Sequence, residues 1–500
     1  MKKPIEGSRL ALSQLEQYLS KAAWILKGPV DASDFKAYIF PLLFFKRISD
    51  VYEEEFLEAL EDSGGDTDYA LLPELHRFVI PDNCHWQDVR EKTTNIGSAL
   101  EKAFRGIEKA NQQFLYGIFG DAQWSNKNKL SDRLLTDLIE HFSQYDLANS
   151  AVDADILGQA YEYLIKHFAD LTNKKAGEFY TPRSVVHLIG MIVDPKEGES
   201  IYDPACGTGG MLIECIEHVR EKKKDFRTLK LYGQEKNLTS SSIARMNMFL
   251  HGVEDFQIAR QDTLRNPAFF QADELMTFDC VIANPPFSLK EWGAENWTND
   301  PFGRNIAGVP PAGNGDMAWV QHMIKSMRSR TGRMAVVLPH GALFRKGAEG
   351  KIRQTLIEKD LLEAVIGLGP SIFYGTQLAA CVLVFRASKA KTTKDQILFI
   401  DASDEIRIGR AQNFLEPEHV NRIFKWYSNF KDVGGKVKLA SRAIIEQNDF
   451  NLNIPLYVEK VIDDKLPSVE EALNDLKQAW NKSVEAEDKF KKILANFLAS

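Results

Sequence analysis

Residues 201–212 read IYDPACGTGGML, a short apolar run followed by an acidic residue and a turn rich in glycine. The apolar run predicts a buried strand that ends at Asp203, and a helix is expected to begin near Met211. Glycine lets a backbone approach a ligand closely, and open α/β sheets bind ligands at the carboxyl ends of their strands. The stretch therefore predicts a ligand-binding turn at the edge of such a sheet.

The order of residues in this turn differs from that of a dinucleotide-binding loop. Dinucleotide folds use G-x-G-x-x-G and place a pyrophosphate at the N-terminus of the helix. Here Asp203 comes first, in the order Asp-Pro-x-x-Gly-x-Gly-Gly. A carboxylate that faces the ligand repels phosphate and attracts a cation, such as the ammonium of a methionine moiety. The turn is therefore expected to hold a cationic ligand.

A second acidic residue, Glu235, ends the next predicted strand. A carboxylate at this position can accept two hydrogen bonds from ribose hydroxyls. Its distance from Asp203 exceeds the roughly 20 residues of the dinucleotide pattern, and the charged stretch 221–224 lies in this interval. The alternative, that Glu235 is only a surface residue at a strand end, stays open.

Another motif, Asn284-Pro285-Pro286-Phe287, follows the predicted strand 280–282. Its two prolines remove two backbone donors and make the segment rigid. The Asn284 side chain and the Pro285 carbonyl offer two acceptors, which suit the two N–H groups of an exocyclic amine on a planar base. Hydrogen bonds to both acceptors would draw the nitrogen lone pair out of the ring and towards a methyl donor. Phe287 would stack on the base. Its place downstream of the glycine turn favours this function over a purely structural proline turn.

Apolar runs that alternate with helical stretches continue along the chain after about residue 150. They predict an α/β fold with a doubly wound, mostly parallel sheet covered on both faces. The last two runs are close in sequence and are expected to form an antiparallel pair at one edge. The runs are 200–202, 230–232, 279–283, 334–338, 364–368 and 381–385.

The chain is long enough for several domains. We expect a helical N-terminal domain over residues 1–150, a catalytic domain over 151–460 and a C-terminal amphipathic helix over 461–500. That last helix either folds back on its own domain or contacts a partner. Both helical predictions rest on apolar residues spaced by three and four, namely Leu12, Leu15, Leu19, Ala22 and Leu26, and then Val469, Leu473, Leu476, Trp480 and Val484.

The composition excludes several classes of protein. A net charge of -8 argues against binding nucleic acid by bulk charge, so contact with DNA must use a local patch or a partner. Five cysteines without a Cys-x-x-Cys pair predict neither a disulfide framework nor a zinc site. No apolar run is long enough for a signal peptide or a membrane span. We expect a cytoplasmic protein with no metal and no membrane contact.

Three motifs, in this order along the chain, resemble those of one enzyme family. Residues 177–183, GEFYTPR, are similar to a motif of the type I adenine-methyltransferases. Residues 203–210 resemble the S-adenosylmethionine motif of amino-methyltransferases, and residues 284–287 resemble their catalytic motif. The resemblance spans about residues 8–460 and includes the stretches 315–322, 332–339 and 451–455.

This resemblance implies an N6-adenine DNA methyltransferase with the S-adenosylmethionine-dependent fold, acting on a base flipped out of the duplex. The implied catalytic residues are Asn284, Pro285, Pro286 and Phe287. The implied cofactor-binding residues are Glu178, Phe179, Tyr180, Thr181, Pro182, Arg183, Asp203, Ala205, Gly207, Thr208, Gly209, Gly210, Glu235 and Asp262. Asp262 would lie near the cofactor's adenine, or would only cap a turn. Taken alone, Thr181-Pro182 predicts a helix N-cap followed by proline at the first position.

The family also implies partners. As the modification subunit of a type I restriction–modification system, the chain would act on double-stranded DNA with a specificity subunit that selects the site. A restriction subunit would join, and each complex would hold two copies of this chain. The acidic charge agrees with a partner that reads the DNA.

Two other functions stay open at this point. One is methylation of a different planar amide or amine, in RNA or in a protein. The other is a non-catalytic assembly module. A cytosine-C5 enzyme is disfavoured because neither Cys206 nor Cys280 is placed as a nucleophile. A free-standing restriction enzyme is disfavoured because the sequence holds no Walker-type phosphate loop.

Overall fold

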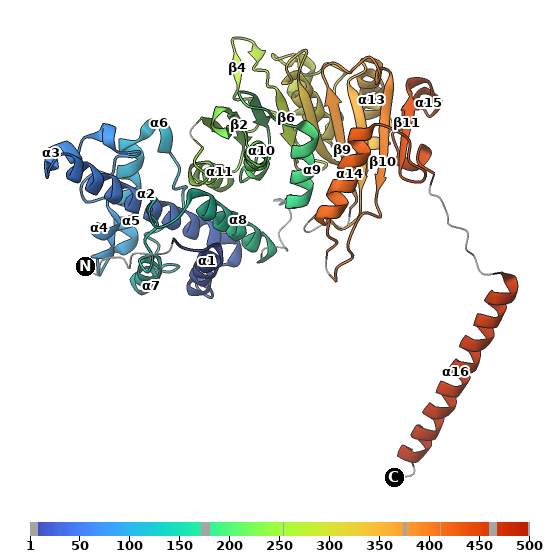
Figure 1. The fold of residues 1–500 in the computed structure, drawn as a ribbon, viewed down its shortest axis with the longest axis horizontal. Coiled ribbons are helices and arrows are strands. Elements are labelled where there is room, and N and C mark those ends of the chain that lie inside the picture. Colours follow the sequence, from blue (N-terminus) through green and yellow to red (C-terminus); the bar gives the residue numbers. More distant parts are fainter. Residues whose placement is uncertain are drawn as a thin grey trace. The chain divides into compact units, whose positions relative to one another are not determined.

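The computed structural model describes residues 9–171, 181–253, 255–373, 378–410, 412–459 and 468–498. The chain divides into two compact units, Met1–Val458 and Glu459–Ser500. The first unit contains a helical part and a large sheet (Figure 1). No helix within the described residues is long and apolar enough to cross a membrane.

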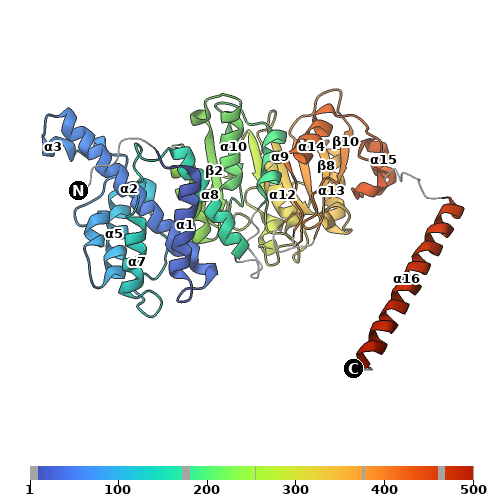
Figure 2. The same cartoon turned by 60° about the horizontal axis from the view of Figure 1, so that its bottom comes forward.

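The helical part is built around the stripe that the sequence predicts. Leu15, Leu19, Ala22 and Leu26 of the first helix are fully buried. The same core takes in Ile243, Met246 and Leu250 of α11 (Leu238–Leu250), so the helical part packs directly on a helix of the sheet region. Figure 2 shows the helical part beside the end of the sheet that carries β2. Its helices are α1 (Leu12–Leu26), α2 (Phe35–Asp62), α3 (Thr67–Ala70), α4 (Trp86–Arg90), α5 (Ile96–Ala110), α6 (Gln112–Leu115), α7 (Asp132–Phe142) and α8 (Ala154–Leu171).

The sheet has nine strands within the described residues, in the order β11-β10-β8-β9-β7-β6-β1-β2-β3. All neighbouring strands are parallel except where β9 pairs with β7 and β8, and where β11 pairs with β10. The strands are β1 (Ser200–Asp203), β2 (Lys230–Glu235), β3 (Phe256–Arg260), β6 (Cys280–Ala283), β7 (Arg333–Pro339), β8 (Leu362–Leu368), β9 (Ala380–Arg386), β10 (Gln396–Ala402) and β11 (Val437–Ser441). A separate hairpin joins β4 (Phe270–Gln271) to β5 (Glu274–Leu275).

The predicted antiparallel pair exists, but its expected place at one edge of the sheet is wrong. β9 lies between β7 and β8, and β10 and β11 continue the sheet beyond β8. Six of the seven residues of β9 are buried, which suits a strand with a neighbour on each side. The hydrophobic runs locate strands along the chain, whereas their order depends on how the connections cross the sheet.

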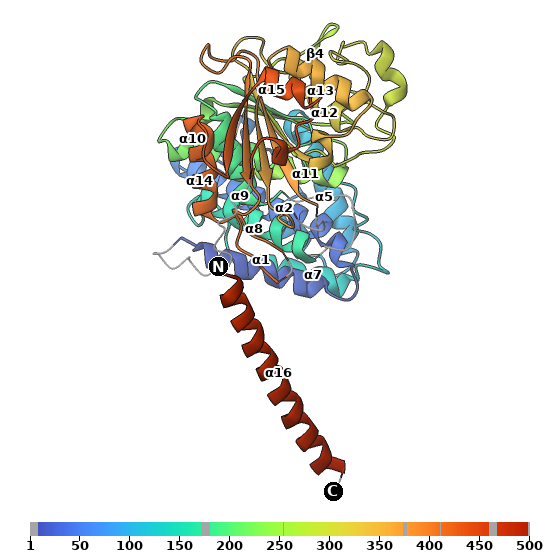
Figure 3. The ribbon, with the colours of Figure 1, turned by 90° about the vertical axis from the view of Figure 1, so that its right-hand side faces the viewer.

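Helices cover both faces of the sheet because successive strand residues point to opposite sides. In β1, Ile201 packs in the core under α9 (Arg183–Val193), α10 (Gly210–Glu221) and α14 (Pro417–Asn429). The next residue, Tyr202, points to the other face of the sheet. It packs in a core covered by three other helices (Figure 3), namely α12 (Asp316–Lys325), α13 (Ala348–Glu358) and α15 (Arg442–Gln447). The prediction of a doubly wound sheet is therefore confirmed.

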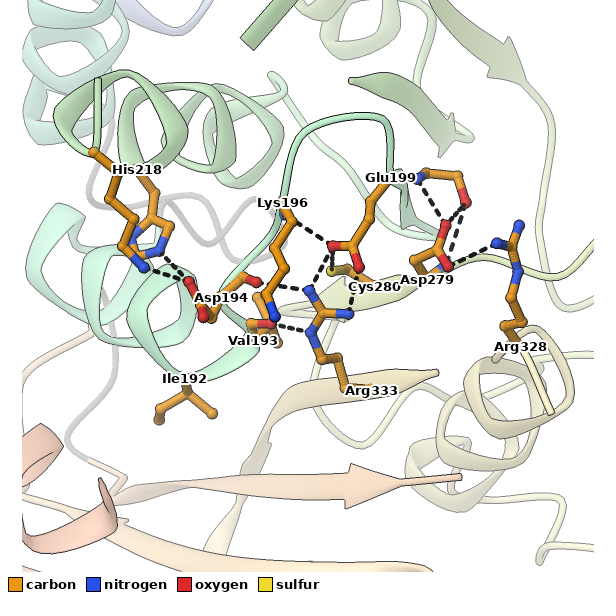
Figure 4. A network of polar contacts seen from close by, with 12 residues as sticks. Ile192, Val193, Asp194, Lys196, Glu199, His218, Asp279, Cys280, Arg328 and Arg333 are labelled. Carbon is orange, nitrogen blue, oxygen red and sulfur yellow. Dashed lines mark hydrogen bonds and ion pairs between the residues drawn. The ribbon is translucent and has the colours of Figure 1, made fainter. Parts of the chain in front are cut away.

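The amino ends of β1, β6 and β7 are tied together by a network of charged side chains (Figure 4), of which Arg333 and Asp279 are buried. The Arg333 guanidinium donates to Glu199 Oε1 at 3.0 Å and to the carbonyl of Asp194 at 2.6 Å. Asp279 accepts from the Ser200 N–H at 3.0 Å and pairs with Arg328 at 2.8 Å. This network closes the edge of the sheet opposite to the carboxyl ends of these strands.

The second unit contains α16 (Val469–Leu498). Its predicted apolar stripe is present, and all five residues are exposed, from Val484 at 45% to Val469 at 79%. The unit therefore presents an amphipathic helix whose apolar side is uncovered within the described chain.

Candidate active site at the carboxyl ends of the strands

Parallel pairing brings the predicted site residues to one edge of the sheet. β1 lies between β6 and β2, with Ile201 opposite Cys280 and Tyr202 opposite Tyr232. Asp203, Glu235 and Asn284 therefore occupy or follow the ends of three adjacent parallel strands. Glu178, Phe179 and Tyr180 lie outside the described residues.

Asp203 is almost completely buried, with 1% of its surface exposed. One carboxylate oxygen accepts a hydrogen bond from the Ala205 N–H at 3.0 Å. Burial is the main cause that raises the pKa of this carboxyl to about 8; the hydrogen bond from the Ala205 N–H opposes this rise, and the nearby Glu235 charge adds to it. A buried carboxyl with a raised pKa is stabilised in its ionised form by a cation, which fits the expected cationic ligand.

The glycine turn has the backbone that its sequence requires. Gly207 and Gly209 have φ values of +53° and +84°, in the left-handed region that favours glycine. A Cβ on Gly209 would lie 2.8 Å from the Met248 side chain, so the turn also packs closely against α11. α10 begins at Gly210, as expected near Met211. The Thr208 carbonyl accepts from Asn247 Nδ2 at 3.2 Å.

Glu235 connects this turn to the end of β2. Its Oε2 accepts from the Gly207 N–H at 3.0 Å, and its Oε1 accepts from the Asn237 N–H at 2.7 Å. The carboxylate is partly exposed. A carboxylate oxygen can accept more than one hydrogen bond, and the ribose contact of Glu235 stays a prediction.

Asp262 follows β3 and takes part in a surface turn. Its carboxylate accepts from Lys236 Nζ at 2.9 Å and from the Arg265 N–H at 3.3 Å. Asp262 therefore caps a turn, which was the alternative to its predicted place near the cofactor's adenine. The next residue, Thr263, donates through its hydroxyl to the Pro204 carbonyl at 2.5 Å and so ties the end of β3 to the glycine turn.

Asn284 makes a contact that its sequence motif does not reveal. Its Nδ2 donates to Thr181 Oγ1 at 2.7 Å. Its Oδ1 is buried and has no hydrogen-bond partner within the described part of the chain. A buried polar atom without a partner carries a free-energy cost of about 1–3 kcal/mol. Asn284 therefore presents an acceptor suited to a ligand N–H.

The prediction that Thr181 caps a helix is wrong. α9 begins at Arg183, its N-cap is Pro182, and no side chain caps it. The Thr181 hydroxyl instead accepts the bond from Asn284, because the tertiary fold brings the two residues together. Arg183 forms an ion pair with Glu162 of α8, so its side chain links two helices.

The rest of the Asn-Pro-Pro-Phe motif is partly open. Pro285 is buried, whereas Pro286 and Phe287 are partly exposed. The Phe287 ring lies 6.1 Å from the Phe373 ring at an angle of 65°, an edge-to-face contact. Stacking of the Phe287 ring on a base stays a prediction.

A buried group behind the strand ends was missed by the sequence reasoning. The Tyr202 hydroxyl lies 3.1 Å from His322 Nε2 and 3.4 Å from Gln234 Oε1. Burial lowers the pKa of His322 well below its usual value, so the imidazole is neutral. These contacts join the residues just before Asp203 and Glu235. The only sequence signal was the resemblance of residues 315–322 to the family.

The fold is that of the S-adenosylmethionine-dependent methyltransferases, and the chain is a methyltransferase. Residues 152–465 match the N-6 DNA methylase family, and residues 15–142 match the HsdM N-terminal domain. The chain belongs to the N-6 DNA methylase family. It is the modification subunit of a type I restriction–modification system, that is, a DNA methyltransferase.

Individual relatives agree with this assignment. The type I restriction enzyme MjaVII methylase subunit of Methanocaldococcus jannaschii is 32% identical over 479 residues, which cover 91% of this chain and 80% of that protein. The HindI methylase subunit of Haemophilus influenzae is 30% identical, covering 83% of this chain and 99% of that protein. The crystal structure of a type I methyltransferase subunit from Streptococcus thermophilus has a TM-score of 0.78 at 30% identity, covering 90% of this chain and all of that chain.

Proposed function

We propose that this chain transfers a methyl group from S-adenosylmethionine to N6 of adenine in double-stranded DNA, as the modification subunit of a complex whose specificity subunit selects the site. The observation that carries the proposal is the buried Oδ1 of Asn284 after the end of β6, which has no hydrogen-bond partner among the residues that the structure describes. Its neighbour β1 ends in Asp203, beside the glycine turn.

The residues at the end of β1 fit this cofactor. Asp203 is a buried carboxylate whose raised pKa favours a cationic partner, and the cofactor carries an ammonium and a sulfonium. Gly207, Gly209 and Gly210 offer backbone without side chains, and Glu235 at the end of β2 is a carboxylate of the kind that binds ribose hydroxyls. When bound, the cofactor supplies an electrophilic methyl group.

The residues at the end of β6 fit an adenine. Asn284 Oδ1 and the Pro285 carbonyl would accept the two N6–H bonds, and Phe287 would stack on the ring. A stacked base contributes about 1–3 kcal/mol, which offsets part of the few kcal/mol that flipping the base costs. The work of the chain is to position and orient the amine, for which preorganised polar groups are effective.

Partners are part of the proposal. The net charge of -8 makes sequence reading by this chain alone unfavourable, and the relatives are methylase subunits of type I restriction enzymes. We propose that a specificity subunit and double-stranded DNA bind the chain, that two copies assemble in each complex, and that a restriction subunit joins them. The exposed apolar stripe of α16 leaves surface for such contacts.

The test is methylation by the chain purified with its native partner subunits. Labelled S-adenosylmethionine would be offered with DNA, RNA and protein, and the product mapped as N6-methyladenine. Label in DNA that disappears with Asn284→Ala supports the proposal. Label found only in RNA or protein would contradict DNA as the substrate. Label in DNA that persists with Asn284→Ala would refute the proposed role of Asn284.

A further inference from the structure

The backbone that follows the Asn-Pro-Pro-Phe motif is held by a buried carboxylate. The Ser288 N–H donates to Asp316 Oδ1 at 2.7 Å. Asp316 is the first residue of α12 and has no exposed surface. A hydrogen bond of this length to an ionised carboxylate belongs to the strong, charge-assisted class. One residue beyond, the Leu289 carbonyl accepts from the Gly315 N–H at 3.0 Å.

The motif has few other backbone groups by which it can be held. Pro285 and Pro286 lack an N–H, so Ser288 carries one of the two backbone donors in residues 285–288. Ser288 also has a φ of +51°, a left-handed conformation that is unfavourable for a residue with a Cβ. The bond that the Ser288 N–H donates to Asp316 therefore fixes the chain directly after Phe287, in a conformation that it would not adopt freely.

Asp316 is itself oriented by Arg345, which follows β7 in the sequence. One guanidinium nitrogen of Arg345 lies 2.7 Å from Asp316 Oδ2, and another donates to Ser288 Oγ at 3.2 Å. Gly341 leaves room for this side chain, because a Cβ there would lie 2.7 Å from the guanidinium. The same guanidinium reaches Glu349 at 3.1 Å. Three segments thus meet at Ser288.

We propose that Asp316 and Arg345 are positioning residues for methyl transfer. They hold Ser288, and through it they set the direction of the Pro285 carbonyl and the Phe287 ring. Thr181 holds Asn284 at the other end of the motif, so the motif is fixed at both ends. The expected effect on methyl transfer rests on the proposed function. The expected effect on the conformation of residues 285–288 does not.

The kinetic test uses Asp316→Asn in the full-length chain purified with its partner subunits. We expect kcat to fall at least tenfold and the dissociation constant of S-adenosylmethionine to change less than twofold. Arg345→Lys keeps a charge but cannot reach both Asp316 and Ser288, so it should lose less activity than Arg345→Met. Unchanged kcat in Asp316→Asn and Arg345→Met would overturn the proposal. It would also be overturned if Asp316→Asn weakened S-adenosylmethionine binding by the same factor as it lowered kcat.

A matched control is Glu199→Gln, which removes a carboxylate paired with Arg333 at the opposite edge of the sheet. This variant should lower the unfolding temperature while kcat stays unchanged. If it lowers kcat as much as Asp316→Asn does, the effect at Asp316 is general destabilisation and the proposal fails.

A second readout does not depend on activity. 4-Fluorophenylalanine at position 287 should give one narrow ¹⁹F resonance, and Asp316→Asn should shift or broaden it. An unchanged resonance would overturn the positioning role. Failure of the wild-type complex to methylate DNA would instead refute the proposed function and leave this comparison valid.

Discussion

Asn284 donates a hydrogen bond from its side-chain nitrogen to the hydroxyl of Thr181 at 2.7 Å, which decides which of its atoms faces a ligand. Because the amide is planar, anchoring Nδ2 turns Oδ1 away from Thr181. That oxygen is buried and unpartnered within the described residues. The side chain is therefore set to accept a hydrogen bond at the carboxyl end of β6, and one of its two N–H donors is used by Thr181.

Replacing Asn284 with alanine removes this acceptor. We expect methyl transfer to fall by about 10²–10³-fold or more, as for the loss of one preorganised polar group in other active sites. Cofactor binding, measured by calorimetry, should stay within about twofold because the glycine turn is unchanged. Normal turnover by this variant would exclude Asn284 from the reaction.

Replacing Thr181 with valine removes the partner that orients Asn284. A neutral hydrogen bond contributes about 1 kcal/mol, so kcat should fall about fivefold. Thr181→Ser keeps the hydroxyl and serves as the control. Equal rates for the valine and serine variants would show that this bond does not orient the amide.

Replacing Gly207 with valine should block cofactor binding. Its φ of +53° is strongly unfavourable for a β-branched residue, and the change in backbone would break the bond from its N–H to Glu235. We expect the dissociation constant to rise by about 5- to 150-fold, which corresponds to a strain of ~1–3 kcal/mol. Gly434→Ala is the comparison, because this glycine lies outside the turn and a Cβ there meets no atom within 4 Å. An unchanged dissociation constant in Gly207→Val would count against the turn.

Cofactor binding should release protons and strengthen as the pH rises. Because the pKa of free Asp203 is raised to about 8, this carboxyl is mostly protonated at pH 7. A cation binds the ionised form, so affinity should rise towards pH 8 and then level off, with about 0.9 proton released at pH 7. Calorimetry in two buffers of different ionisation enthalpy measures this number. Proton uptake, or affinity that falls between pH 6 and pH 8, would be the wrong sign.

The same raised pKa affects the stability of the cofactor-free protein. The folded state keeps a proton on Asp203 that the unfolded state loses above its ordinary pKa of 3.8. The contribution of this group is therefore greatest below pH 3.8 and is lost as the pH rises towards 8. Asp203→Asn should flatten this part of the profile, measured by urea unfolding between pH 5 and pH 8.

Replacing Arg333 with methionine tests the charge network at the amino ends of the strands. It leaves Glu199 without its partner, and the pair is largely buried, with side-chain exposures of 9% and 21%. Removing one partner of a buried ion pair typically lowers the free energy of unfolding by about 3–5 kcal/mol. Because Glu199 is partly exposed, we expect a loss at the lower end of this range. Urea unfolding should show the loss, while kcat at a temperature well below unfolding stays near wild type. A large loss of kcat without loss of stability would contradict this structural role.

Local patterns predicted much of the fold. Strand β1, the glycine turn and the start of α10 follow from residues 201–212, because burial and the freedom of glycine are properties of neighbouring residues. The strands β3, β10 and β11 were not predicted, and β9 was placed at an edge although it lies inside the sheet. Strand order depends on contacts between residues far apart in sequence, which a hydrophobic run does not encode.

The site divides in the same way. The sequence by itself determined that Asp203, Gly207, Glu235 and Asn284 are the chemically equipped residues at strand ends, because each lies in a short motif with its own conformational preference. Only the tertiary structure decided that Thr181 orients Asn284 instead of capping a helix, and that Asp316 and Arg345 hold Ser288. Those bonds join residues 28 to 103 positions apart in the sequence. They form because parallel strands bring their carboxyl ends to one edge of the sheet, where loops from distant parts of the chain contact one another.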